Sequence, residues 1–154
     1  MFRRLGLSRA PLVLGIVLGL GAVGFAASPA ARPPDAAAAS CVRIAGGVFN
    51  APGNDNYMPY LNGEYIIIRN YCSTYRLLTG WRVHDYGSKH TYYFPSGYRI
   101  YPGYYVRLHS GTGTNTKYNL YWKRTYGAVW NNAPPERAYL LNQYRTVVST
   151  WSSY

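Results

Sequence analysis

Three histidines, His84, His90 and His109, are the side chains of this chain that could exchange protons near neutral pH. A Ser–His–Asp arrangement would have to draw on Ser88 or Ser110, His84 or His90, and Asp85. No motif holds these residues at a defined spacing, and strand neighbours such as His84 and Asp85 point to opposite faces. We therefore expect surface histidines rather than a catalytic triad.

The sequence also lacks the residues that a zinc site, a glycosidase site or a phosphate-binding loop would need. A zinc site needs three or four clustered Cys or His ligands, and the two cysteines are better used in a disulfide. Asp55, Glu64 and Asp85 are too few and too separated for the carboxylate pair of a glycosidase. The Gly-Thr-Gly loop at 111–113 lacks the lysine and the strand–loop–helix context of a phosphate-binding loop. We predict a domain that is not an enzyme and holds no metal and no cofactor.

The elements that carry these side chains are predicted to be strands, because apolar and polar residues alternate with a period of two. Strands are expected at 42–46, 64–69, 81–85, 91–94, 105–109, 120–122, 128–130, 137–141 and 146–151. The run 64–69 is the most β-prone, and we expect a central strand packed on both faces. Loops are expected at 50–63 and 110–116. Many short strands separated by turns predict an all-β antiparallel sandwich.

The start of the chain predicts a cleaved signal peptide over residues 1–27. Arginines supply positive charge, and an uncharged run of 17 residues at 11–27 ends in small residues. That run is short for a comfortable membrane span. Residues 28–40 are interpreted as an Ala/Pro-rich linker or leader tail, and residues 41–154 as one domain. We expect this domain to be secreted, with no stable membrane anchor after cleavage.

Two cysteines in an exported domain predict one disulfide, Cys41–Cys72. It would close a loop of about 31 residues and stabilise the fold by up to about 3.7 kcal/mol. A lipid-attachment box ending at Cys41 is disfavoured, because Arg32 and Asp35 separate this cysteine from the apolar run.

The charge of the chain favours anionic partners. The net charge is +11, with 16 Lys and Arg against 5 Asp and Glu. Four basic residues and one acidic residue precede Cys41, so the domain keeps twelve basic and four acidic residues, which gives it a net charge of +8. Wall polymers, phospholipid headgroups, nucleic acid and acidic glycans would all attract such a domain. The alternative interpretation is that arginine keeps an aromatic-rich exported protein soluble.

All 18 tyrosines follow residue 40, which is more hydroxyl groups than one core can hold. Several must therefore lie at or near the surface. Tyrosine beside arginine is typical of contact surfaces, although β-propensity explains most of these tyrosines.

Six short motifs follow one another in a characteristic order. They are LNGEYIIIRN at 61–70, LTGWRVHD at 78–85, YFPSG at 93–97, IYPG at 100–103, LYW at 120–122 and VWNN at 129–132. In this order and spacing the chain resembles the lamin tail domain over about residues 42–154. This immunoglobulin-like β-sandwich ends the nuclear lamins and occurs in many bacterial secreted proteins. The resemblance implies a binding or structural role and no reaction.

The motifs also predict the core of such a sandwich. Its expected members are Tyr65, Ile67, Trp81, Phe94, Trp122 and Trp130. Glu64 stands at a position that is commonly acidic in the family, and we expect it to be structural, paired with Arg82 or Arg99. Acidic residues common in bacterial members are replaced here by Arg or Tyr, which argues against a calcium role.

The leading functional hypothesis is a secreted, non-catalytic binding module that contacts an anionic cell-wall polymer or another exported protein. The predicted contact residues are the outward-facing Arg82, His84, Tyr105, Arg107 and His109, together with the adjacent Gly/Thr loop. One alternative is a nucleic-acid-binding domain that uses Arg and Tyr for phosphates and bases. A second alternative is an accessory to an exported hydrolase, or a small hydrolase itself.

Overall fold

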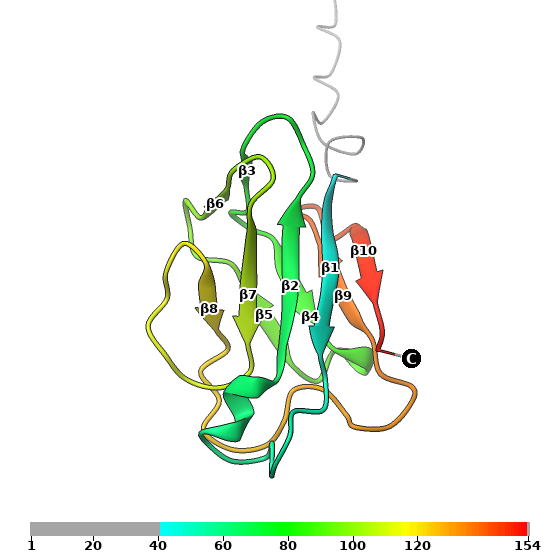
Figure 1. The fold of residues 1–154 in the computed structure, drawn as a ribbon. Coiled ribbons are helices and arrows are strands. Elements are labelled where there is room, and N and C mark those ends of the chain that lie inside the picture. Colours follow the sequence, from blue (N-terminus) through cyan, green and yellow to red (C-terminus); the bar gives the residue numbers. More distant parts are fainter. Residues whose placement is uncertain (1–40, 154) are drawn as a thin grey trace, which may run out of the picture. The chain divides into compact units, whose positions relative to one another are not determined.

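The computed structural model describes residues 41–153, which form a two-layered β-sandwich (Figure 1). The first sheet has the order β1 (Val42–Val48), β2 (Tyr65–Asn70), β7 (Tyr105–His109), β8 (Asn119–Tyr121). The second has the order β10 (Val147–Trp151), β9 (Ala138–Leu141), β4 (Arg82–His84), β5 (Thr91–Tyr93). A small third sheet pairs β3 (Arg76–Leu77) with β6 (Arg99–Ile100), and the 3₁₀ turns are η1 (Tyr60–Gly63) and η2 (Tyr86–Ser88).

The predicted signal peptide and the predicted linker lie outside the described residues. Within residues 41–153, no helix is long and apolar enough to cross a membrane.

The strand pairings are antiparallel with one exception, so the predicted all-β sandwich is confirmed. The exception is β7 with β8, which run parallel, and Leu108 pairs with Leu120. A parallel pair requires the chain to return along the sheet before the second strand begins. The expected Gly/Thr loop belongs to that return, between His109 and Asn119.

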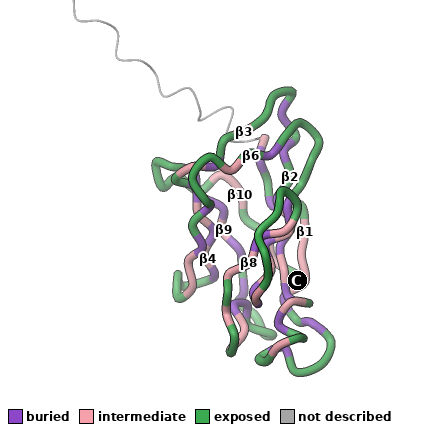
Figure 2. The backbone as a smooth tube through the Cα atoms, turned by 90° about the vertical axis from the view of Figure 1, so that its left-hand side faces the viewer, coloured by how far each residue is buried: buried purple, intermediate pink, exposed green. Residues whose placement is uncertain are grey.

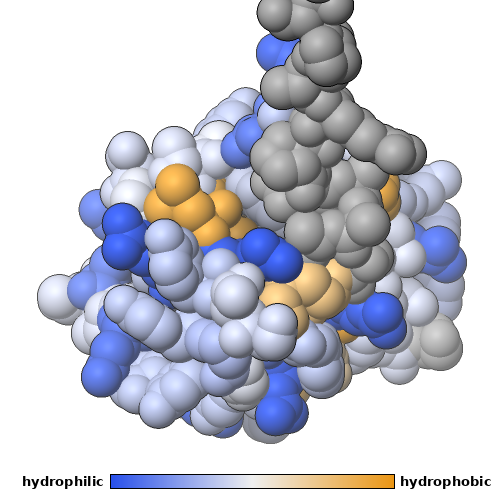
Figure 3. Space-filling view, turned by 90° about the horizontal axis from the view of Figure 1, so that it is seen from above, coloured by the Kyte–Doolittle hydropathy of each residue, from blue (hydrophilic) through white to orange (hydrophobic). Residues whose placement is uncertain are grey.

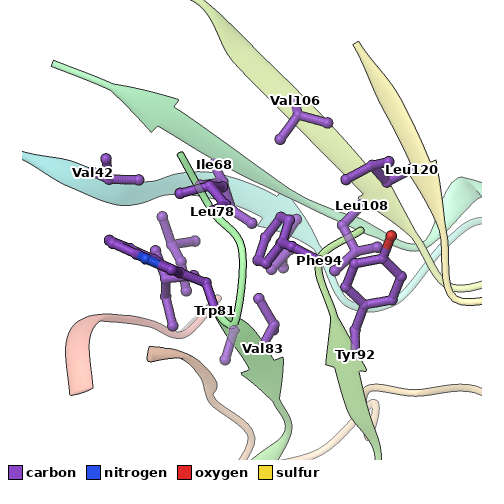
Figure 4. Close-up of a cluster of buried hydrophobic side chains, with 14 of the residues drawn as sticks. Val42, Ile68, Leu78, Trp81, Val83, Tyr92, Phe94, Val106, Leu108 and Leu120 are labelled. Carbon is purple, nitrogen blue, oxygen red and sulfur yellow. The ribbon is translucent and has the colours of Figure 1, made fainter. Parts of the chain in front are cut away.

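The core lies between the two sheets. In Figure 2 buried and half-buried segments follow the strands, whereas the connecting loops are largely exposed. Trp81, Phe94 and Trp130 are buried, as predicted. Trp122 is half-buried and packs against the edge of the core. Figure 4 shows residues of the first sheet (Val42, Ile68, Val106, Leu108, Leu120) facing Trp81, Val83, Tyr92 and Phe94.

The expectation that β2 is packed on both faces is wrong. Ile66 and Ile68 are fully buried, whereas Tyr65 and Ile67 are half-buried on the opposite side of the strand. The second sheet covers only one face of the first, so the side chains of alternate residues remain on the outer face. Tyr65 and Ile67 are therefore not core residues.

The segment 128–130 was expected to be a strand but has an irregular conformation. Its residues Val129 and Trp130 are nevertheless buried, and Trp130 stacks on Phe49 with ring centres 4.8 Å apart. The backbone N–H groups of both residues donate to the carboxylate of Glu64 instead of to a neighbouring strand. A buried side chain thus replaces the sheet partner of this segment.

The predicted disulfide is present. Cys41 precedes β1 and Cys72 follows β2, and their Cα atoms are 5.3 Å apart. The final hairpin also turns where expected, at Asn142. The Asn142 N–H donates to the carbonyl of Thr146, and the Asn142 side chain accepts the N–H groups of Tyr144 and Thr146.

Candidate functional site

All four acidic side chains of residues 41–153 are buried. The exposed fractions are 3% for Asp55, 0% for Glu64, 1% for Asp85 and 2% for Glu136. A buried carboxylate is costly unless hydrogen bonds compensate for the lost water. The partners of these groups therefore show what each acid does.

Glu64 connects the start of β2 to the segment 128–130. Its two carboxylate oxygens accept the N–H groups of Val129 at 3.0 Å and Trp130 at 3.2 Å. Burial raises the pKa of Glu64 to about 7, because desolvation outweighs these hydrogen bonds. The expected pairing with Arg82 or Arg99 is wrong, since the Glu64 carboxylate bonds backbone N–H groups.

Glu136 holds a second irregular segment. It accepts the N–H groups of Tyr86 at 3.0 Å, Asn131 at 2.8 Å and Arg137 at 2.8 Å. Tyr86 lies in η2, and the other two donors lie in the loop that precedes β9, so one carboxylate joins the two segments. Like Glu64, it satisfies the backbone where no strand partner is present.

Asp85 has a histidine as its partner. It accepts the backbone N–H of His90 at 2.9 Å, and its other oxygen lies 2.8 Å from Nδ1 of the same residue. His84 instead contacts the Ser88 hydroxyl at 3.2 Å and the carbonyl of Asp85 at 2.8 Å. Serine and carboxylate therefore contact different histidines, so Ser88, His84, Asp85 and His90 do not form one Ser–His–Asp relay.

The basic residues are distributed in the opposite way. The twelve Lys and Arg residues between Arg43 and Arg145 are all half-buried or exposed. The charged groups on the surface of residues 41–153 are therefore cations. This separation of charge by depth makes the surface more uniformly cationic than the net charge of +8 suggests.

The predicted contact residues do not form one surface. Tyr105, Arg107 and His109 alternate along β7 and face outward from the first sheet. Arg82 and His84 lie on β4 in the second sheet. The outer faces of two stacked sheets point away from each other, so the five residues belong to two opposite faces.

The outer face of the first sheet is the richer of the two in paired cations and aromatic rings. We call it the Arg/Tyr face. It consists of Arg43, Tyr65, Arg69, Tyr105, Arg107, His109 and Tyr121. Strand register brings them together, with Tyr65 opposite His109 and Arg69 opposite Tyr105.

Cation–π contacts order this face. The Arg107 guanidinium lies 5.4 Å from the ring centre of Tyr65 and 5.7 Å from that of Tyr105. The ring of His109 is 5.6 Å from Tyr65 and stacks on Tyr121 at 5.1 Å. Such contacts hold long side chains in place and lower the conformational entropy lost on binding.

Four members of the Arg/Tyr face were not among the predicted contact residues: Arg43, Tyr65, Arg69 and Tyr121. Tyr65 was assigned to the core, and Tyr121 was not singled out. The alternation within β2 would have identified Tyr65 if Ile66 and Ile68 had been recognised as the inward pair. Tyr121 joins the face only because β8 pairs with β7, a contact between strands that local sequence does not reveal.

His109 is fixed on both sides of its ring. Nδ1 lies 2.8 Å from the carbonyl oxygen of Asn62, and Nε2 lies 3.1 Å from Oδ1 of Asn119. These contacts orient the ring against Tyr121 and connect η1 to β8 across the end of β7. His109 is therefore a half-buried member of the face with a structural part.

The motif order, the sandwich topology and the sequence comparison agree. A family model of the lamin tail domain matches residues 35–154. This chain belongs to the lamin tail domain family. A search of curated proteins gives no match. The lamin tail domain is an immunoglobulin-like interaction module, which agrees with a non-catalytic binding domain whose acidic side chains hold the structure together.

In this lamin tail domain, no group of three or more His, Cys, Asp or Glu side chains converges as a metal site among residues 41–153.

Proposed function

We propose that this protein is an exported binding module that attaches to an anionic extracellular polymer through its Arg/Tyr face. The observation that carries the proposal is the burial of every acidic side chain of residues 41–153 beneath a surface whose charges are all cationic. A polyanion approaching this surface meets no exposed carboxylate that would repel it.

The Arg/Tyr face offers both charge and contact area. Arg43, Arg69 and Arg107 supply three guanidinium groups, which suit carboxylate and phosphate geometry. Neighbouring tyrosines add rigid rings that bury apolar area at little conformational cost.

Nucleic acid is the second candidate, because the same face interleaves Arg with exposed rings. Arg107 between Tyr65 and Tyr105 has the composition of a surface that binds phosphates and stacks bases. Export argues against nucleic acid as the main ligand, and export itself is proposed from the first 27 residues.

A binding titration with the full-length chain tests the proposal. The ligands are an anionic cell-wall polymer, a neutral polysaccharide and a single-stranded DNA, each at several salt concentrations. We expect the anionic polymer to bind most tightly and its affinity to fall as salt rises. Preference for DNA would replace the proposal by the second candidate, and binding to none of the three would overturn both.

A pair of variants locates the surface. Arg69→Gln with Arg107→Gln removes two cations from the Arg/Tyr face, and we expect affinity for the anionic polymer to fall about tenfold. Lys89→Gln with Arg137→Gln removes the same charge beside β5 and β9 of the second sheet and serves as the control. Equal losses in the two variants would show attraction by net charge alone.

Export is tested separately. Protein recovered outside the cytoplasm of an expressing bacterium should begin after the leader, at a terminus determined by mass spectrometry. A cytosolic chain that retains residues 1–27 would contradict the export part of the proposal.

A further inference from the structure

A groove of about 330 Å³ opens between the end of β6, the turn that leads into β7 and the start of β8. Three tyrosines and two cations line most of it: Tyr101, Tyr104, Tyr118, Arg99 and Lys117. Its volume is at the lower end of the range for small-ligand pockets. In the view onto this end of the domain, strongly hydrophilic residues lie among residues of intermediate hydropathy (Figure 3). The groove therefore joins cations to aromatic rings in one hollow.

The rings and cations of the groove hold one another in place. Tyr104 and Tyr118 stack with ring centres 6.1 Å apart and planes inclined by 15°. The Lys117 ammonium lies 4.8 Å from the ring centre of Tyr118, and Arg99 lies 5.1 Å from that of Tyr75. Tyr98 fixes the β8 side, because its hydroxyl donates to the Lys117 carbonyl at 3.0 Å.

The β6–β7 wall is fixed by the buried Asn70 at the end of β2. The Asn70 side-chain amide donates to the carbonyls of Ile100 and Thr74, each at 2.9 Å. Its backbone N–H donates to the Tyr104 carbonyl at 3.0 Å, and its carbonyl accepts the Gly103 N–H at 2.9 Å. The turn that carries Tyr101 and Tyr104 is thus tied to the central strand, and the groove is preformed.

We propose that this groove binds one short stretch of an acidic polysaccharide. A sugar ring packs its C–H face on Tyr104 and Tyr118, and its carboxylate or phosphate lies between Arg99 and Lys117. The inference rests on the proposed function and adds to it a defined subsite and a ligand class. The groove is next to the Arg/Tyr face, since Tyr104 is followed directly by Tyr105 of that face.

The number of cations favours sugar over nucleic acid. A nucleic-acid strand needs a track of several cations, whereas two cations line this groove. Arg99 and Lys117 together can bind the single acidic group of one sugar unit.

The test is calorimetric titration of the full-length chain with four probes. They are a hexamer of galacturonic acid, a neutral dextran oligomer of the same length, polyphosphate and oligo(dT). We expect the galacturonate hexamer to bind, the neutral oligomer to bind at least tenfold more weakly, and oligo(dT) to bind more weakly than the hexamer. Tighter binding of oligo(dT) would overturn the sugar assignment.

Variants separate the charges from the rings. Arg99→Gln with Lys117→Gln should weaken the galacturonate hexamer about tenfold. The control pair Lys89→Gln with Arg137→Gln should weaken it less than twofold. A groove pair that behaves like this control pair overturns the inference.

Tyr118→Ala tests the ring. It should weaken the hexamer severalfold and leave polyphosphate, which has no sugar ring, unchanged. Tyr118→Phe keeps the ring and should bind as the original protein does, whereas Tyr93→Ala on β5 is the exposed-tyrosine control. Equal loss of both probes in Tyr118→Ala would overturn ring packing.

The two proposals can fail separately. Suppose that the unaltered protein binds the hexamer, and that binding is weakened in the Arg69/Arg107 variant but not in the Arg99/Lys117 variant. The groove inference is then wrong and the proposed function stands. If the unaltered protein binds no anionic polymer, both are overturned.

Discussion

The carboxylate of Glu64 accepts the backbone N–H of Trp130 at 3.2 Å, across 66 residues of chain. The contact joins the start of the central strand β2 to an irregular segment whose tryptophan fills the core. It also removes an acidic group from the surface. The same arrangement recurs at Glu136, which accepts three backbone N–H groups, so acids in this domain hold irregular segments in place.

The raised pKa of Glu64 predicts stability that falls as pH rises. Its pKa is about 7 when folded and 4.5 when unfolded, so the folded state binds the proton more tightly. The contribution of Glu64 is therefore full below pH 4.5 and is lost as pH rises through 7, a change of about 3 kcal/mol. Urea unfolding between pH 4.5 and pH 8 measures it.

Glu64→Gln should remove this component of the pH dependence and destabilise the domain at every pH, because an amide N–H₂ then faces a backbone N–H. The difference between the variant and the original protein isolates Glu64 from other titrating groups. An unchanged pH profile in the variant would contradict the assignment.

The two faces of β2 predict unequal effects from neighbouring isoleucines. Ile66→Ala should lower the free energy of unfolding by about 2–5 kcal/mol, since Ile66 is fully buried between the sheets. Ile67→Ala removes the same atoms from the half-buried outer face and should cost about 1 kcal/mol or less. Denaturant unfolding of both variants compares them directly. Equal losses of unfolding free energy in the two variants would indicate that β2 is packed on both faces.

Asn70 is predicted to be the most sensitive asparagine outside the hairpin turn. Asn70→Ala leaves the carbonyls of Ile100 and Thr74 and the N–H of Cys72 without their side-chain partner. We expect a loss of about 3 kcal/mol in the free energy of unfolding. Asn50→Ala, at an exposed position, is the matched control and should change stability by less than about 0.5 kcal/mol. A similar loss of stability in both variants would contradict the prediction that the hydrogen bonds of the Asn70 side chain stabilise the domain.

Reduction of Cys41–Cys72 should destabilise the domain by up to about 4 kcal/mol. The bridge joins residues 31 positions apart and so reduces the number of conformations that the unfolded chain can adopt. Thermal unfolding with and without dithiothreitol measures the loss. The double variant Cys41→Ala with Cys72→Ala should be insensitive to the reductant. A reductant effect that persists in that variant would have another origin.

Local pattern was sufficient for much of the fold. Alternation located β7 at 105–109, and the β-prone run at 64–69 became β2 with a shift of one residue. The disulfide also followed from the sequence, because the two cysteines of one small domain have one way to pair with each other. The strands depend on residues close together in the sequence, and the disulfide has one possible pairing.

The candidate site was predictable only in part. Tyr105, Arg107 and His109 do share an outward face, as alternation along one strand requires. Arg82 and His84 share the other outer face, because β4 belongs to the second sheet. Period-two alternation separates the two sides of a strand but does not indicate which sheet that strand joins.

The sequence by itself determined the family, the strand-rich architecture, the disulfide and the excess of basic residues. Tertiary structure alone decided that the four acids are buried, that Tyr65 and Arg107 meet on one face, and that a tyrosine-lined groove forms beside β8. The reason is physical. Composition counts charges, whereas burial and strand register between residues far apart in the chain decide which charges water and a partner molecule can reach.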